Sequence, residues 1–186
     1  MKVLCKSLLI GVTGAAAATA IPGHVSFLRR GLVQTVRVIM TRSAAKLVSP
    51  QAMQAYSGQA VFIDGFDEGS NLYVPHIQLV READLFLVMP ATANAIAKAA
   101  HGIADDLLST AIIASPGPVV IVPCMNESMW FSKVVQRNVE LARAHGYHVM
   151  EPTRGIEIAD LKPTFGAMPP LEQIMGTISL LLARKS

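Results

Sequence analysis

The sequence predicts an α/β fold in which one parallel sheet is covered by helices on both faces. Apolar runs of strand length recur along the chain, and segments with helical spacing of apolar residues separate them. The first run, Ser-Leu-Leu-Ile-Gly-Val at 7–12, is apolar throughout, as is typical of strands buried on both faces of a parallel sheet. Strands that alternate with helices favour this layered architecture.

The order of elements follows from the apolar runs and from the residues that interrupt them. Strands are expected at residues 7–12, 35–41, 60–63, 84–89, 119–122 and 148–150. Helices are expected at 15–30, from 42, and at 50–56, 77–83, 96–100, 104–114, 133–145 and 171–184. Residues 64–74 are polar and contain glycine, which is typical of a mobile loop. With four prolines and two glycines, residues 151–170 are expected to form an irregular flap.

Length and composition favour one cytoplasmic domain that associates with copies of itself. The 186 residues suit a single compact domain. The chain is 52% apolar and 16% charged, so we expect a homo-oligomer that buries further surface between subunits. The net charge of +3 comes from scattered basic residues, which argues against nucleic-acid binding. Cys5 and Cys124 make neither a disulfide framework nor a metal site, as is typical of cytoplasmic proteins.

The first residues allow two interpretations. Early lysines, an apolar run at 8–12 and Ala-Thr-Ala at 18–20 resemble a secretory signal. The same residues also suit a first strand, a glycine turn and the start of a helix. We favour this second interpretation, because cleavage after Ala20 would remove the edge of the predicted fold. No membrane span is expected, because the chain lacks a run of about eighteen apolar residues free of turn formers.

Small and polar residues follow several of the predicted strands. Open α/β sheets bind ligands outside the carboxyl ends of their strands, so these residues are candidates for a binding site. Small residues at 14–18 would let a phosphate approach a helix N-terminus, although the third glycine of a G-x-G-x-x-G fingerprint is missing. The hydroxyls of Thr41 and Ser43 suit either a phosphate or the cap of the following helix, and capping is the commoner role.

Two further residues are candidates for chemistry. His76 precedes the fourth strand, and because histidine titrates near neutral pH, it is either a general base or a structural residue. Asn126 lies in the segment PCMNESMW at 123–130, after the fifth strand. Its amide can donate to and accept from a substrate carboxylate without adding a charge. The methionines and Trp130 of this segment also suit packing against the core.

Two motifs indicate a resemblance to a known family. Residues 90–94, Pro-Ala-Thr-Ala-Asn, resemble the PASANT motif with small departures, and residues 123–130 match PxMNxxMW without a mismatch. Together with His76 they make nearly the whole chain similar to the homo-oligomeric flavin-containing cysteine decarboxylases. The resemblance implies a three-layer Rossmann-like (flavodoxin-like) fold and a single flavoprotein domain at 1–186. It also implies trimers or dodecamers that hold FMN between subunits.

The resemblance assigns roles to particular residues. His76 would be the catalytic base, Asn126 the ligand of the substrate carboxylate, and Met129 a substrate contact. Residues 151–170 would form a substrate clamp, and no metal is implied. Cys124 stands at a variable position of its motif and receives no catalytic role. The residues implied at FMN are Gly11, Thr13, Thr41, Ser43, Thr92, Ala93, Asn94, Gly102, Asp105, Asp106, Leu107 and Met125.

The family contains more than one activity. We expect oxidative decarboxylation of the C-terminal cysteine of a ribosomally made precursor peptide to an aminoenethiol, as in lantibiotic biosynthesis. The alternative is decarboxylation of 4′-phosphopantothenoylcysteine in coenzyme A biosynthesis. Enzymes of that kind carry a flap cysteine that supports reduction of the enethiol, and this chain has no cysteine after Cys124. A flavin prenyltransferase of the UbiX type and a non-catalytic phosphatase regulator are less favoured alternatives.

Overall fold

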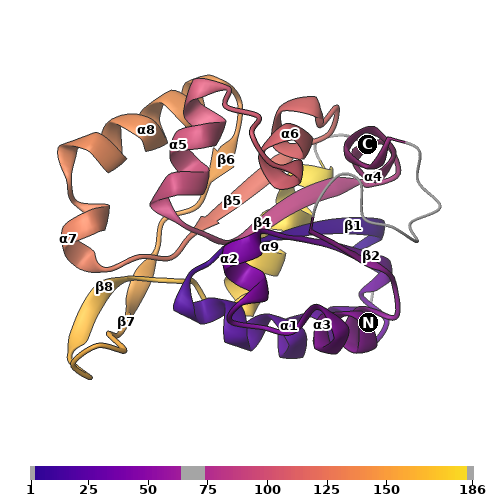
Figure 1. Ribbon diagram of the computed structural model, residues 1–186, viewed down its shortest axis with the longest axis horizontal. Helices are drawn as coiled ribbons and strands as arrows, with labels where there is room; N and C mark the ends of the chain where they lie inside the picture. Colours follow the sequence, from indigo (N-terminus) through magenta and orange to yellow (C-terminus); the bar gives the residue numbers. More distant parts are fainter. Residues whose placement is uncertain (1–2, 64–73, 184–186) are drawn as a thin grey trace.

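The computed structural model describes residues 3–63 and 74–183, and a six-stranded parallel sheet lies at its centre (Figure 1). The strand order is β3-β2-β1-β4-β5-β6, so the order reverses between β1 and β4. The strands are β1 (Cys5–Val12), β2 (Val33–Met40), β3 (Val61–Phe62), β4 (Leu85–Ala91), β5 (Val119–Pro123) and β6 (His148–Val149). This order is that of a Rossmann-like sheet, which confirms the predicted fold class.

β1 lies in the middle of this sheet. The sequence suggested that it lies at the edge of the fold, and this expectation was wrong. β1 pairs with β2 on one side and with β4 on the other. Its side chains alternate between the two faces. Leu8 and Ile10 are buried in one hydrophobic core, and Leu9 is buried in the other. Burial on both faces explains why this strand is a continuous apolar run in the sequence.

Helices cover both faces of the sheet, which completes the predicted three layers (Figure 1). They are η1 (Ala16–Ala20, a 3-10 helix), α1 (Ile21–Arg29), α2 (Arg42–Ala45), α3 (Pro50–Ser57), α4 (Pro75–Arg81), α5 (Ala93–His101), α6 (Leu107–Ala114), α7 (Glu127–Trp130), α8 (Lys133–Ala144) and α9 (Leu171–Ala183). α1, α3 and α9 pack on one face, and α4, α5, α6 and α8 pack on the other. None of the helices in the described ranges has the length and apolar character needed to cross a bilayer.

Capping side chains move several of the predicted helix starts. The helix expected at 15–30 is divided into η1 and α1, and Pro22 stands in the first turn of α1, where its missing N–H is harmless. The side chain of Thr92 caps α5, which therefore begins at Ala93 and not at 96. The side chain of Asp106 caps α6, which begins at Leu107 and not at 104. Each cap satisfies an N–H group that the helix itself leaves without a partner.

Residues 151–170 were expected to be irregular, but they contain an antiparallel hairpin. Its strands are β7 (Thr153–Ile156) and β8 (Pro163–Ala167), and it extends away from the sheet (Figure 1). None of the four residues of β7 is buried, so no apolar periodicity marks the strand in the sequence. We call residues 153–167 the clamp. The loop expected at 64–74 lies outside the described residues, apart from the exposed Val74.

Candidate active site

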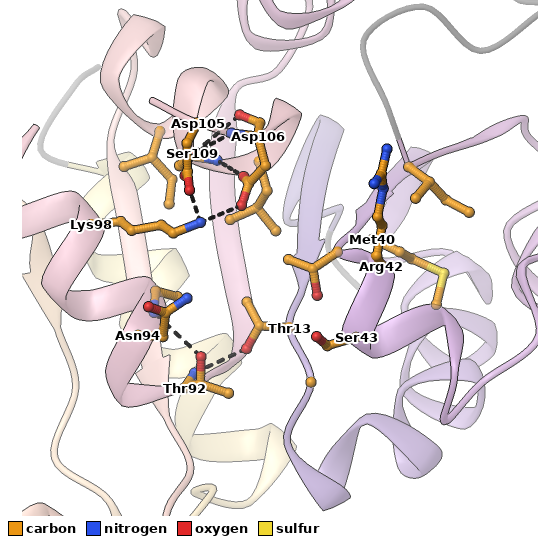
Figure 2. A pocket seen from close by; sticks show the side chains of 16 residues that line it. Thr13, Met40, Arg42, Ser43, Thr92, Asn94, Lys98, Asp105, Asp106 and Ser109 are labelled. Atoms are coloured by element: carbon orange, nitrogen blue, oxygen red, sulfur yellow. Dashed lines mark hydrogen bonds and ion pairs between the residues drawn. The ribbon is translucent and has the colours of Figure 1, made fainter. Parts of the chain in front are cut away.

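A cavity of about 460 Å³ lies beside the carboxyl ends of β1, β2 and β4, where the strand order reverses. This volume is in the range of small-molecule sites. The residues that follow these strands supply much of its lining (Figure 2). Its polar lining residues are Thr13, Thr41, Arg42, Ser43, Thr92, Asn94, Lys98, Asp105, Asp106 and Ser109. We call it the switch-point cavity.

Thr13 joins the ends of β1 and β4 through a side chain that is only 2% exposed. Its hydroxyl donates to the carbonyl oxygen of Pro90 at 2.7 Å and accepts from the backbone N–H of Thr92 at 2.9 Å. Figure 2 shows Thr13 and Thr92 side by side at the cavity wall. Because the hydroxyl proton of Thr13 is engaged with Pro90, this residue shapes the cavity wall and offers a ligand no hydroxyl proton in this geometry.

Thr41 and Thr92 each cap a helix at the cavity. The side-chain oxygen of Thr41 accepts from the backbone N–H of Ala44 at 3.2 Å, and that of Thr92 accepts from Ala95 at 3.3 Å. The capping role considered for Thr41 is therefore confirmed. A hydroxyl that accepts in a cap still carries a proton to donate, so both residues remain suited to a ligand.

Three of the residues expected at the cofactor support the cavity without lining it. Gly11 lies inside β1, where a Cβ would come within 3.0 Å of side-chain atoms of Phe86 and Leu108. Gly102 ends α5 with a φ of +67°, which glycine adopts readily. Leu107 is 5% exposed and belongs to the hydrophobic core, and its neighbour Leu108 lines the cavity instead.

Lys98 lines the switch-point cavity, and sequence analysis missed it. Its ammonium forms ion pairs with Asp105 at 2.6 Å and with Asp106 at 2.7 Å, and 15% of its side chain is exposed. The turn at Gly102 brings these two aspartates back beside α5 (Figure 2). Arg42 was also missed, although it directly follows Thr41. The signal available in the sequence was a lysine followed, beyond a glycine, by two adjacent acidic residues.

The ion pairs determine the charges of this wall. Burial alone would lower the pKa of Lys98, but hydrogen bonds to Asp105 and Asp106 outweigh it and raise the pKa. Burial alone would raise the pKa of Asp106, but hydrogen bonds from Lys98 and from Ser109 outweigh it and lower the pKa. Lys98 and Asp106 are therefore both charged at neutral pH.

A second cavity, of about 540 Å³, lies between the clamp and the carboxyl end of the sheet. It shares Gly14 and Thr92 with the switch-point cavity, so the two cavities adjoin. Alanines of η1, Met129 and the clamp supply most of its walls, together with Ala93 and Met125, which were expected at the cofactor and do not line the switch-point cavity. Glu157 is the one charged residue in the part of its lining that the structure describes. We call it the clamp cavity.

Asn126 lines the clamp cavity and caps α7. Its side-chain oxygen accepts from the backbone N–H of Met129 at 2.9 Å. The cap uses one lone pair of the amide oxygen and orients the side chain, and the amide N–H groups can donate to a ligand. N–H donors suit a carboxylate, whose oxygens only accept hydrogen bonds when it is ionised.

Cys124 also lines the clamp cavity. Burial raises the pKa of its thiol and outweighs the opposing effect of the backbone N–H groups of Met168 and Ala17. The thiol is therefore protonated at neutral pH, and a protonated thiol is a poor nucleophile. Cys124 contributes shape to the cavity and no reactive thiolate.

His76 and Asn126 do not meet within one chain. His76 belongs to the first turn of α4, which packs against α6. α4 and α7 lie at opposite ends of the molecule in Figure 1, and Asn126 directly precedes α7. Among the described residues that line the two cavities, His76 does not occur. A site that uses both residues therefore needs a second copy of the chain.

Curated relatives of this chain act in coenzyme A biosynthesis, by their names. The chain is 45% identical over 120 residues to the coenzyme A biosynthesis bifunctional protein CoaBC of Bacillus subtilis, which covers 64% of this chain and 30% of that protein. It is 33% identical over 186 residues to the same bifunctional protein of Haemophilus influenzae, which covers 100% of this chain and 46% of that protein. The chain thus spans less than half the length of these relatives.

Solved structures with the same fold include cysteine decarboxylases, by their descriptions. The FMN-dependent cysteine decarboxylase SpaF is 36% identical, with a TM-score of 0.82 and coverage of 96% of this chain and 97% of SpaF. MrsD from Bacillus sp. HIL-Y85/54728 is 27% identical, with a TM-score of 0.82 and coverage of 97% and 98%. A family model described as flavoprotein matches residues 3–182, which confirms the expected flavin cofactor. The chain belongs to the flavoprotein family.

Proposed function

We propose that the protein is an FMN-dependent decarboxylase that removes the carboxylate of a cysteine in its substrate. The pair of adjoining cavities carries this proposal. One has a lining that suits a flavin nucleotide, and the other contains Asn126. The similarity to SpaF, an FMN-dependent cysteine decarboxylase by its description, supports the same reaction class.

The lining of the switch-point cavity fits FMN. Arg42 adds a positive charge to this lining, whereas the charge of Lys98 is balanced by Asp105 and Asp106. The hydroxyls and the amide of the wall suit a phosphate or a ribityl chain. Gly14 lets Ser43 lie close to the end of β1, because a Cβ at Gly14 would come within 2.5 Å of the Cβ of Ser43. Bound FMN supplies an acceptor for the two electrons removed from the cysteine. Apolar walls for a ring system come from Met40, Ile63, Leu108 and Ile112.

Asn126 would hold the substrate carboxylate. The cap fixes its side chain through the N–H of Met129, so the amide N–H groups are oriented before the substrate binds. An amide adds no charge, whereas an arginine at this position would stabilise the carboxylate anion in the ground state and so oppose its loss as CO2.

The sequence relatives favour 4′-phosphopantothenoylcysteine as the substrate. The two CoaBC proteins, at 45% and 33% identity, support this reaction more strongly than the peptide reaction that we expected first. Because the chain covers only 30% and 46% of those proteins, we propose the decarboxylation alone and not their second activity.

A peptide with a C-terminal cysteine is the second candidate, and the clamp cavity favours it. A phosphate group is normally bound by arginine, lysine or backbone N–H groups. The described lining of the clamp cavity contains no lysine or arginine, and its charged residue, Glu157, is acidic. The chain also has no cysteine after Cys124 that could support reduction of an enethiol.

His76 would act as the base from a neighbouring subunit of a homo-oligomer. The separation of α4 from α7 excludes a contact between His76 and Asn126 within one chain. The 16% charged composition favours burial of surface between copies. A site shared between two subunits would combine both residues. The same arrangement is expected if FMN is held between subunits.

Mixed oligomers test this shared site. His76→Asn and Asn126→Asp subunits are each expected to bind flavin and to be inactive alone. If they are co-expressed with different tags, sites that combine the intact His76 and the intact Asn126 should restore about a quarter of the wild-type activity in random mixtures. Mixed oligomers without activity would show that His76 is not a base supplied across the interface.

Mass spectrometry of the products tests the reaction and separates the substrates. The purified flavoprotein is incubated with synthetic 4′-phosphopantothenoylcysteine and with peptides that end in cysteine. A loss of about 44 Da indicates that CO2 leaves alone, and a loss of about 46 Da indicates that two hydrogens are also removed by the cofactor. Turnover of peptides alone would favour the second candidate, and turnover of neither substrate would contradict the proposed function.

A further inference from the structure

The clamp meets the segment before Asn126 through backbone atoms, at Gly166. The backbone N–H of Met125 donates to the carbonyl oxygen of Gly166 at 3.1 Å. A Cβ on Gly166 would overlap the carbonyl oxygen of Met125 and would lie 3.2 Å from the carbonyl carbon of Met125 and 3.3 Å from that of Asn126. The φ of Gly166 is +119°, a conformation that residues with a side chain rarely adopt. Only glycine therefore allows this approach.

The contact at Gly166 is one of three that fix Asn126. On the sheet side, the backbone N–H of Cys124 donates to the carbonyl oxygen of Ala91 at 2.9 Å. On the helix side, Asn126 itself caps the N–H of Met129 at 2.9 Å. The third contact comes from the clamp, through Gly166. The backbone N–H groups of Cys124 and Met125, directly before Asn126, are thus held by the sheet and by a hairpin that lies outside it.

We infer that Gly166 is a positioning residue, which lets the clamp hold the backbone of Met125 so that the Asn126 amide can reach the substrate carboxylate. This inference rests on the proposed function. Gly166 lines the clamp cavity, but it has no side chain with which to act on a substrate. Its contribution is to place Asn126 through the backbone of Met125.

Gly155 provides a matched control within the same hairpin. A Cβ on Gly155 would lie 2.5 Å from the Cβ of Ala167, and its other neighbour within 4 Å is also an atom of Ala167. Gly155→Ala therefore strains the pairing of β7 with β8 but does not press on Met125 or Asn126. The control separates damage to the hairpin from displacement of Asn126.

The experiment compares Gly166→Ala with Gly155→Ala in the full chain. Flavin absorbance reports whether the central fold is intact. It should not respond to the clamp directly, because no clamp residue lines the described part of the switch-point cavity. For Gly166→Ala we expect retained flavin, amide hydrogen exchange at Met125 that is faster by about tenfold or more, and kcat lower by about tenfold or more. For Gly155→Ala we expect an unchanged Met125 exchange rate, a raised KM, and kcat within about twofold of the wild type.

Three results would overturn the inference. In the first, Gly166→Ala changes only KM, as the control does. In the second, the Met125 amide of this variant keeps its wild-type exchange rate. In the third, the variant loses flavin, which would show that Gly166 serves the whole fold. If the wild type turns over neither substrate, the proposed function fails, but the exchange rate of Met125 still decides whether Gly166 holds this segment.

Discussion

The two adjoining cavities are built from different parts of the chain. The switch-point cavity is lined by strand ends and helices of the central fold, and its wall contains the ion pairs of Lys98 with Asp105 and Asp106. The clamp cavity takes much of its lining from a hairpin outside the sheet, and only Glu157 is charged in its described lining. On the proposed function, the Rossmann-like sheet would supply the cofactor site, and the hairpin would supply much of the substrate site.

The largest effect is expected at Asn126, where the clamp cavity is proposed to bind the carboxylate. Asn126→Asp keeps the cap of α7, because aspartate accepts the N–H of Met129 as well as asparagine does. Its charge would repel the substrate carboxylate, so we expect kcat/KM to fall by about a hundredfold or more. Steady-state decarboxylation assays measure this loss.

Stability measurements on two variants provide the control. Unfolding in urea should show Asn126→Asp within about 0.5 kcal/mol of the wild type, because the cap is kept, whereas Asn126→Ala should lose about 1 kcal/mol. An Asp variant that retains more than about a tenth of the wild-type activity would show that Asn126 does not hold the carboxylate.

The second effect is expected at Lys98, in the switch-point cavity. Lys98→Met would leave Asp105 and Asp106 without their cation, and we expect weaker flavin retention and a loss of about 2 kcal/mol of stability at pH 7. This figure is reduced because the side chain of Asp105 is 59% exposed and its charge is screened by solvent. Lys133→Met, at an exposed lysine of α8, is the matched control and should change neither property.

The pH dependence of the stability lost in Lys98→Met identifies whether that loss is electrostatic. The folded-state pKa of Asp106 is lowered, so its pairing stabilises the fold above its unfolded pKa of about 3.9 and is lost as the pH falls through the folded value. The folded-state pKa of Lys98 is raised, so its contribution is present below about 10.4 and is lost at higher pH. The difference in unfolding free energy between the wild type and Lys98→Met should therefore shrink toward pH 3. A difference that is the same at pH 3 and pH 7 would contradict an electrostatic origin.

The sequence predicted the central fold better than it predicted either cavity. The strands were recognisable because burial on both faces makes them continuous apolar runs, as for Leu8 and Leu9 in β1. Lys98 was missed because its place at the cavity depends on the turn at Gly102, which brings Asp105 and Asp106 back beside it. The hairpin was missed because its pairing depends on docking against residues such as Met125 and not on a buried apolar row.

His76 shows a different kind of limit. The motif resemblance assigns a catalytic role to it, but one chain places α4 and α7 at opposite ends of the molecule. A sequence does not say which residues come together across a subunit interface. The cap by Asn126, in contrast, involves residues only three apart in the sequence. A cap of this kind can therefore be predicted from the sequence alone.

A smaller effect is expected at Thr13, which is hydrogen-bonded to Thr92, a residue that lines both cavities. Thr13→Val removes the hydroxyl that accepts the N–H of Thr92, and we expect a loss of about 1 kcal/mol of stability together with weaker flavin retention. The carbonyl oxygen of Pro90 keeps the backbone N–H of Thr13 as a donor at 3.2 Å, which limits the loss. Thr13→Ser keeps the hydroxyl and should stay within about 0.5 kcal/mol in the same urea titration. Equal losses in both variants would show that the methyl group, and not the hydrogen bond, matters.

The smallest effect is expected at Cys124, and it tests whether the clamp cavity acts only through its shape and its N–H donors. Burial raises the pKa of this thiol, so it is protonated at neutral pH and offers no thiolate. We expect Cys124→Ala to keep kcat within about twofold and to leave the product mass unchanged. If Cys124 instead supplied the proton that completes a saturated thiol, its removal would turn a mass loss of about 44 Da into one of about 46 Da. A change in product mass, even with normal turnover, would show that the clamp cavity contains an acid as well as a carboxylate site.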